Sequence, residues 1–107
     1  IYAWGSEGLK RKYVPALASG QELGGYGLTE PGAGSDSGGT KTTAVRKGDR
    51  YVLNGRKCFI TNATYAKSLI CTAVTDPGKG PKGISAFVVE RAFPGFSIEK
   101  GEVKLGM

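Results

Sequence analysis

Glycine is the residue that most constrains how this chain can fold. It occupies 18 of 107 positions, more than twice the share of about 7 % that is usual in proteins. The glycines follow no three-residue period, which excludes a collagen-like triple helix. Glycine favours tight turns and lets the backbone approach a ligand closely. The sequence therefore predicts many turns and a binding surface lined by backbone.

Length and composition predict one soluble globular domain or a part of one. Apolar residues make up 39 % of the chain and charged residues 22 %, which argues against disorder. The chain begins with Ile1 and ends with Met107 without a polar tail, so we expect a fragment of a longer protein. No apolar run approaches the roughly 20 residues of a membrane span, and no signal peptide is visible. We expect no membrane partner.

Basic residues give the chain a net charge of +6. Many of them lie close together in the sequence, at Lys41, Arg46, Lys47, Arg50, Arg56 and Lys57. This cluster predicts either a solvated hairpin surface or a surface that attracts phosphates. The phosphates would belong to a nucleotide cofactor or to a nucleic acid.

The two cysteines, Cys58 and Cys71, stand in apolar runs that resemble strands. They have no metal-ligand spacing, and the chain contains no histidine. We therefore predict no metal site and two buried free thiols in a reducing compartment. A disulfide between them is the alternative.

Residues 6–18 have an apolar stripe near helical spacing and predict a helix. Ser6 is a suitable N-cap, and Gly20 is a suitable stop signal. Pro15 is expected to end or kink the helix, because it lacks a backbone N–H and its ring clashes with the preceding turn.

Beyond residue 20 the pattern changes to short strands separated by turn signals, which predicts an all-β barrel or sandwich. Hairpin residues 47–50, the dipeptide Asn54-Gly55 and the loop 76–82 are the main predicted turns. The expected strands span residues 23–29, 41–46, 51–53, 57–61, 68–75, 84–90 and 96–100.

The segment GLTEPGAGSDSGG, residues 27–39, follows a strand and is rich in glycine. Glycines at positions 32, 34, 38 and 39 allow positive φ, and successive amides in such a turn bind anions. Ser35 adds a hydroxyl donor, so the segment suits a pyrophosphate. It is neither a Walker loop nor a Rossmann fingerprint. A wide turn between two strands is the alternative interpretation.

The segment NGRKCFITN, residues 54–62, alternates as a strand that places Phe59 and Thr61 on one face. An aromatic ring beside a hydroxyl suits packing and hydrogen bonding to a flat heteroaromatic ring. Alternatively, Phe59 is a core residue next to an ordinary strand threonine.

Together these two segments resemble the acyl-CoA dehydrogenase family. Its motif of Thr and Glu before a glycine-rich turn is matched by Leu28, Thr29, Glu30, Gly34, Ser35 and Asp36. EGLKRKYVPALASGQ resembles the helix that closes the N-terminal domain, and YVLNGRKCFITNA resembles the second flavin segment. GISAFVVERAFPGFSI and GEVKLGM are similar to the last strands of the middle domain. The Thr-Glu-Pro-Gly form is more like dehydrogenases than acyl-CoA oxidases.

The resemblance implies that residues 1–20 end the N-terminal helical domain and residues 21–107 form the FAD-binding middle β-domain. The C-terminal helical domain would be absent. The implied activity is oxidation of an acyl-CoA to a trans-2-enoyl-CoA with hydride transfer to flavin N5. The implied partners are acyl-CoA, here short-chain, and an electron-transferring flavoprotein, with a homotetramer as the assembly and the bacterial cytoplasm, or alternatively the mitochondrial matrix, as the location.

Site residues carry over from the family position by position. Phe59, Ile60 and Thr61 would flank the flavin ring, with the Thr61 hydroxyl near N5, although many relatives carry Trp where Phe59 stands. Lys79 or Lys82 would lie near CoA phosphate, or in a plain solvated loop. The residues implied to bind FAD are Tyr26, Leu28, Thr29, Gly34, Ser35, Phe59, Ile60 and Thr61, and Ser35 is also implied to approach the acyl-CoA.

The catalytic base is not expected within this chain, because no carboxylate stands where the family places it. The base would lie beyond residue 107, and Glu30 is expected to fix loop geometry. We therefore expect the isolated chain to be inactive and to bind FAD weakly. The alternatives are a basic β-barrel that binds nucleic acid, or an acyl-CoA oxidase or flavin monooxygenase with the same fold.

Overall fold

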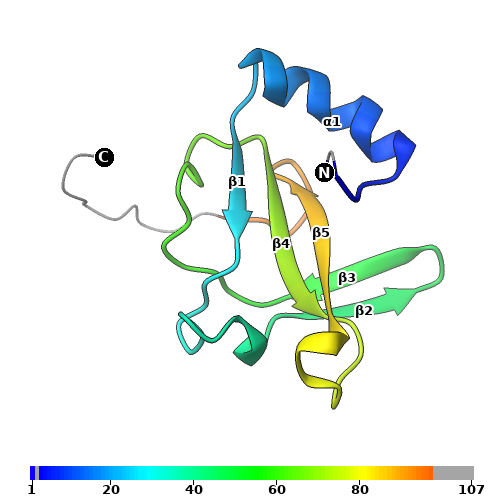
Figure 1. The fold of residues 1–107 in the computed structure, drawn as a ribbon, viewed down its shortest axis with the longest axis vertical. Coiled ribbons are helices and arrows are strands. Elements are labelled where there is room, and N and C mark those ends of the chain that lie inside the picture. The colour runs from blue at the N-terminus through cyan, green and yellow to red at the C-terminus, as the bar shows by residue number, and fades with distance from the viewer. Residues whose placement is uncertain (2, 98–107) are drawn as a thin grey trace.

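The computed structural model describes residue 1 and residues 3–97. One helix precedes a five-stranded sheet, and two short 3-10 helices lie in the loops (Figure 1). The elements are α1 (Glu7–Ser19), β1 (Gly24–Gly27), η1 (Ser37–Gly39), β2 (Thr43–Lys47), β3 (Arg50–Asn54), β4 (Ser68–Val74), η2 (Gly80–Gly83) and β5 (Ile84–Glu90).

Strand β4 organises the sheet. It pairs with β5 in antiparallel fashion along its whole length. Its other edge is shared, because β1 runs parallel to residues 68–71 and β2 meets β4 only at Thr43 opposite Val74. Strands β2 and β3 form an antiparallel hairpin that projects from the sheet (Figure 1). A short gap therefore remains between β1 and β2 on one edge of β4.

The prediction of a mainly β fold is confirmed, but a closed barrel is not formed by the described residues. Their five strands make an open sheet. Residues 57–61, which are predicted to form a strand, lie in a loop instead. Of the predicted strand 96–100, Phe96 and Ser97 lie outside any strand. The rest of that strand and GEVKLGM lie outside the described residues.

Helix α1 begins and ends where the sequence predicts. The Ser6 hydroxyl accepts a hydrogen bond from the Leu9 amide at 3.3 Å, and Gly20 adopts φ 80° at the C-terminal end. Of the two expected effects of Pro15, an end of the helix is wrong, since α1 continues to Ser19, and a kink stays a prediction. Proline removes one hydrogen bond, but the following turn is held by packing. A β-carbon on Gly24 would lie only 3.2 Å from Leu17 Cδ2.

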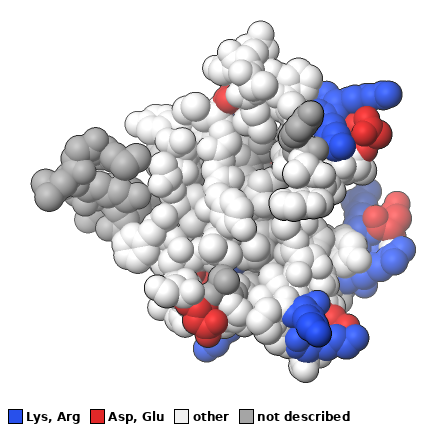
Figure 2. Space-filling model, in the orientation of Figure 1, with Lys and Arg blue, Asp and Glu red and all other residues white. Residues whose placement is uncertain are grey.

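The hydrophobic core is made mostly of small side chains. Among the described residues, no large side chain is fully buried, and several aromatic side chains are exposed. The buried apolar residues are Tyr13, Ala33, Ala44, Ala66, Leu69 and Ala73. Figure 2 shows charged residues at the margin of the face in view and an uncharged centre. The described residues thus leave large aromatic side chains, among them Trp4 and Tyr65, on the surface.

The hairpin and loop predictions hold at both ends of the sheet. Gly48 takes φ 66° at the β2–β3 tip, and residues 76–82 are exposed. At the tip, Arg46 Nε donates to the Gly48 carbonyl and Arg50 lies 4.0 Å from Asp49. The arginines at the tip therefore form a solvated surface. No helix in residues 1 and 3–97 has the length and apolar composition to cross a membrane.

Candidate functional site

A buried ion pair lies at the centre of the candidate site. Lys57 Nζ lies 2.6 Å from Glu30 Oε2, and their side chains are only 11 % and 5 % exposed. Glu30 comes from the glycine-rich segment, where it also pairs with Ala33 across a tight turn. Lys57 comes from the loop after β3. The pair therefore joins the two segments in which the sequence analysis places the binding residues.

The Glu30 carboxylate also holds the start of β2. One of its oxygens accepts from the Lys41 amide at 2.7 Å. The other accepts from the Thr42 amide at 3.2 Å and from the Thr42 hydroxyl at 2.6 Å. Glu30 thus fixes the loop between β1 and β2, as expected from its position before Pro31.

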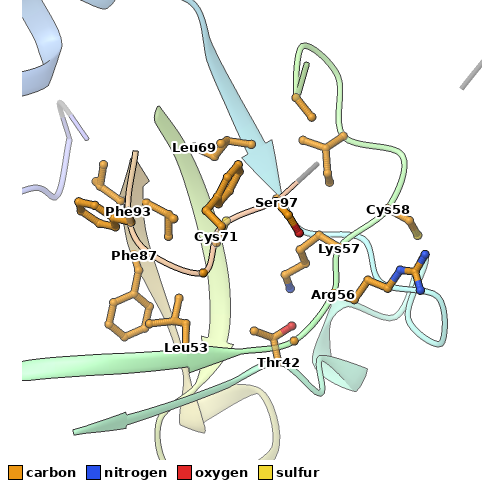
Figure 3. A pocket seen from close by; sticks show the side chains of 18 of the residues that line it. Thr42, Leu53, Arg56, Lys57, Cys58, Leu69, Cys71, Phe87, Phe93 and Ser97 are labelled. Atoms are coloured by element: carbon orange, nitrogen blue, oxygen red, sulfur yellow. The ribbon is translucent and has the colours of Figure 1, made fainter. Parts of the chain in front are cut away.

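Lys57 fills the gap between β1 and β2 on the edge of β4. Its ammonium donates to the Leu28 carbonyl at 3.2 Å and to the Thr72 hydroxyl at 3.1 Å. Beside it, the Cys58 amide donates to the Thr29 carbonyl at 2.8 Å. Figure 3 shows the Lys57 side chain pointing from its loop toward Thr42. The interpretation of Lys57 as part of a solvated basic cluster is therefore wrong.

Burial of the Glu30 carboxyl would raise its pKa, but hydrogen bonds from Lys57, Thr42 and the two amides outweigh this effect. They lower the pKa from 4.5 to about 2. A lowered pKa means that the carboxylate stabilises the fold fully above pH 4.5, and that this stabilisation disappears as the pH falls through 2.

This shift predicts acid sensitivity that depends on one residue. In the longer protein proposed below, Glu30 is expected to contribute about 3 kcal/mol at neutral pH. Urea unfolding of wild type and Glu30→Gln from pH 7 to pH 2.5 measures this contribution. The difference between the two proteins should shrink steadily below pH 4.5. A difference that stays constant down to pH 2.5 would contradict the lowered pKa.

Residues 57–61 do not form the predicted strand. Phe59 and Asn62 take φ of 55° and 63°, which is incompatible with an extended strand. The segment crosses β1, because a β-carbon on Gly25 would lie 3.2 Å from the Thr61 carbonyl oxygen. Its backbone is held by Thr29 through Cys58 rather than by a neighbouring strand. Strand alternation therefore does not place Phe59 and Thr61 on a common face.

The predicted tight turn at Asn54-Gly55 is also wrong. Asn54 is the last residue of β3, and Gly55 continues into the loop. Gly55 is needed for close approach: an added β-carbon would lie 2.7 Å from Thr42 Cα. The glycine thus lets the end of the hairpin lie directly against its beginning.

The glycine-rich segment achieves its shape without the predicted positive φ at positions 32, 34, 38 or 39. Gly38 instead allows a close approach to η2, because a β-carbon there would lie 3.0 Å from Pro81 Cγ. Gly34 has open space where a β-carbon would stand. Gly34 and Ser35 are exposed, so this part of the segment leaves its backbone accessible.

A broad open hollow lies beside the ion pair, with a volume of about 1310 Å³. This exceeds the roughly 300–1,000 Å³ of a typical ligand pocket. Figure 3 shows Leu53, Phe87 and Phe93 on the side away from Lys57. Of the predicted site residues, Phe59, Ile60 and Thr61 line the hollow, whereas Tyr26, Leu28, Thr29, Gly34 and Ser35 do not. Tyr26 is 57 % exposed.

Both cysteines line this hollow as free, half-buried thiols, which confirms the prediction of free cysteines and corrects that of full burial. Burial raises the pKa of Cys71, although the nearby Lys57 charge acts in the opposite direction. Sequence reasoning missed Lys57, Thr42 and Thr72 as parts of the site. The signal that could have found Lys57 is its place directly before the apolar residues Cys58, Phe59 and Ile60, because a lysine that becomes buried needs a partner for its charge.

Residues 25–107 match the family model for the middle domain of acyl-CoA dehydrogenases. The chain belongs to the acyl-CoA dehydrogenase family. This membership confirms the resemblance seen in the sequence. The matched domain therefore includes the glycine-rich segment 27–39, the Lys57 loop and strands β2 to β5.

Curated and solved relatives agree with membership in the acyl-CoA dehydrogenase family. The short-chain specific acyl-CoA dehydrogenase of Clostridium acetobutylicum is 55 % identical over 96 % of this chain and 27 % of its own length. Butyryl-CoA dehydrogenase of Megasphaera elsdenii matches with a TM-score of 0.93 and 46 % identity, over 97 % of this chain and 27 % of its own. Glutaryl-CoA dehydrogenase of Mycobacterium smegmatis, solved with FADH2, matches with a TM-score of 0.87 and 41 % identity, over 98 % of this chain and 26 % of its own. The chain thus spans about a quarter of these relatives.

Proposed function

We propose that the chain is the FAD-binding middle part of a longer acyl-CoA dehydrogenase, which we call the parent protein. FAD, when bound, would accept a hydride at N5 from the β-carbon of an acyl-CoA while a base removes the α-proton, giving a trans-2-enoyl-CoA. The base would lie outside this chain. The relatives named for short-chain and butyryl-CoA substrates support a short-chain acyl-CoA.

The observation that carries the proposal is the junction of the two segments by the Glu30–Lys57 pair. Lys57 and Cys58 hold the carbonyls of Leu28 and Thr29, so residues 57–58 are joined to residues 28–30 as one unit, which Phe59 follows directly. At its edge Phe59 is 64 % exposed and has positive φ. Non-glycine residues in such strained conformations gather at functional sites.

The side chains available on this unit fit a flavin ring. The exposed Phe59 ring offers a flat apolar surface for stacking. Thr61 is an exposed residue, and its hydroxyl would donate a hydrogen bond near N5. Because the carbonyls of Leu28 and Thr29 are already bonded, these two residues would act through their amides and the Thr29 hydroxyl. Tyr26 and Ile60 would complete the contacts.

The open backbone around Gly34 and Ser35 suits the pyrophosphate of FAD. Its exposure and the space beside Gly34 support this role. Ser35 would also approach the acyl-CoA. The exposed apolar surfaces support contact with further domains of the parent protein, which we propose to be a homotetramer. Electrons would leave to an electron-transferring flavoprotein, and the bacterial cytoplasm is the proposed location.

The test uses the parent protein without oxygen. Its visible spectrum should show a flavin band that bleaches when butyryl-CoA is added. Thr61→Val should keep the bound flavin but slow the bleaching, since only the hydroxyl is removed. A flavin band that ignores every acyl-CoA would refute the dehydrogenase activity. A colourless protein that takes up no added FAD would refute the cofactor as well, and rapid peroxide release in air would indicate an oxidase.

A further inference from the structure

The Lys57 ammonium is an unusual group for the interior of a small β domain. Lysine is seldom buried, because removing its charge from water is costly unless the charge is paired. Here the charge meets three acceptors on two parts of the chain: Glu30 and the Leu28 carbonyl in the glycine-rich segment, and the Thr72 hydroxyl in β4. The ammonium thus ties the glycine-rich segment to the central strand β4.

Fold stability alone does not account for this arrangement. Apolar side chains of similar volume often replace a buried ion pair without loss of stability. An apolar side chain, however, cannot hold the Leu28 carbonyl. That carbonyl belongs to the peptide bond that supplies the Thr29 amide, and the neighbouring Cys58 amide holds the Thr29 carbonyl at 2.8 Å.

We propose that Lys57 is a positioning residue for the flavin site, which it serves through Glu30 and the Leu28 carbonyl. This inference rests on the proposed function. Lys57 fixes the position of the backbone of residues 28–29 relative to the loop that carries Phe59 and Thr61. The backbone and the loop can then contact the same flavin ring. Binding groups must be held within about 0.5 Å of their productive positions to act together. The three hydrogen bonds of the Lys57 ammonium restrain the two segments in this way.

The experiment compares two ion pairs of the same residue types in the parent protein. The double variant Glu30→Leu with Lys57→Met removes the buried pair and leaves no unpaired charge. The matched control, Glu22→Leu with Lys67→Met, removes a pair of 2.8 Å that is largely exposed. Three quantities are measured: hydrogen exchange of residues 27–30 and 57–62 without FAD, FAD affinity by flavin fluorescence, and the flavin reduction potential.

Side chains that orient the groups around a bound metal typically contribute about tenfold to hundredfold in affinity. By the same reasoning, the buried-pair variant should bind FAD about tenfold more weakly, shift the flavin potential and exchange faster in both segments. The control should match wild type. If the buried-pair variant folds with wild-type affinity, potential and exchange, the proposal is overturned.

The exchange measurement separates this proposal from the proposed function. If the wild-type parent protein binds no FAD, the proposed function fails. Hydrogen exchange is measured without FAD, so unchanged exchange in the buried-pair variant would still overturn the positioning role. If that variant does not fold, Thr42→Val takes its place, because it removes only the 2.6 Å bond to Glu30. Its faster exchange and altered flavin potential support the proposal, and wild-type values overturn it.

Discussion

Glu30→Gln in the parent protein is expected to destabilise the region around the ion pair by about 3–5 kcal/mol. Burial disfavours any charge here, and the fold tolerates Lys57 only because Glu30 balances it. Glutamine keeps the size of the side chain but leaves the ammonium without a counter-charge. The amides of Lys41 and Thr42 would also lose an ionised acceptor.

Hydrogen exchange of the cofactor-free parent protein measures this loss locally, since it reports the opening of individual segments. The affected peptides should cover residues 27–42 and 55–62. Glu22→Gln is the matched control, because Glu22 pairs with the exposed Lys67 and little should change. Combining Glu30→Leu with Lys57→Met should recover part of the loss. Equal exchange in Glu30→Gln and Glu22→Gln would show that the buried pair contributes nothing to stability.

Gly55→Ala is expected to destabilise the same region by about 1–3 kcal/mol through overpacking. The new methyl group would lie 2.6 Å from Thr42 Cβ and 2.7 Å from Thr42 Cα. A flexible side chain could move aside, but the Thr42 backbone cannot, because Glu30 holds its amide and Val74 donates to its carbonyl. The strain would therefore spread into the ion pair.

Urea unfolding measures the stability of Gly55→Ala, and two further glycine variants serve as comparisons. Gly8→Ala lies in α1 with no atom near the added methyl, so it should stabilise the helix slightly. Gly55→Asn distinguishes a close approach from a tight turn. Asparagine tolerates a left-handed turn but is even larger than alanine. Wild-type stability of Gly55→Asn in urea unfolding would mean that position 55 acts as a turn after all.

Much of the fold follows from local sequence signals. Ser6 and Gly20 mark the ends of α1, the alternating residues around Gly48 mark a hairpin, and the apolar runs of β4 and β5 mark strands, of which β4 is largely buried. These elements depend on neighbours that are close in the sequence or on simple burial. The family motif likewise lies in one short segment, so the family could be identified before the structure.

The errors arise where distant residues decide the conformation. Residues 57–61 have strand-like alternation, but none of the described strands pairs with them, and their backbone partners are Leu28 and Thr29. Periodicity describes side-chain faces and cannot show which backbone is available for pairing. Lys57 was grouped with solvated basic residues for the same reason, since its burial depends on Glu30 and on the gap beside β4.

Glu30 accepts hydrogen bonds from both ends of the β2–β3 hairpin, from Lys41 and Thr42 before it and from Lys57 after it. The length of the hairpin beyond these contacts is then free to vary, because its exposed tip at residues 47–49 does not line the hollow. Exposed loop tips of this kind accept inserted sequence well. The tip is accordingly the natural place to graft a fluorescent tag, and the place where relatives can gain or lose residues without altering their chemistry.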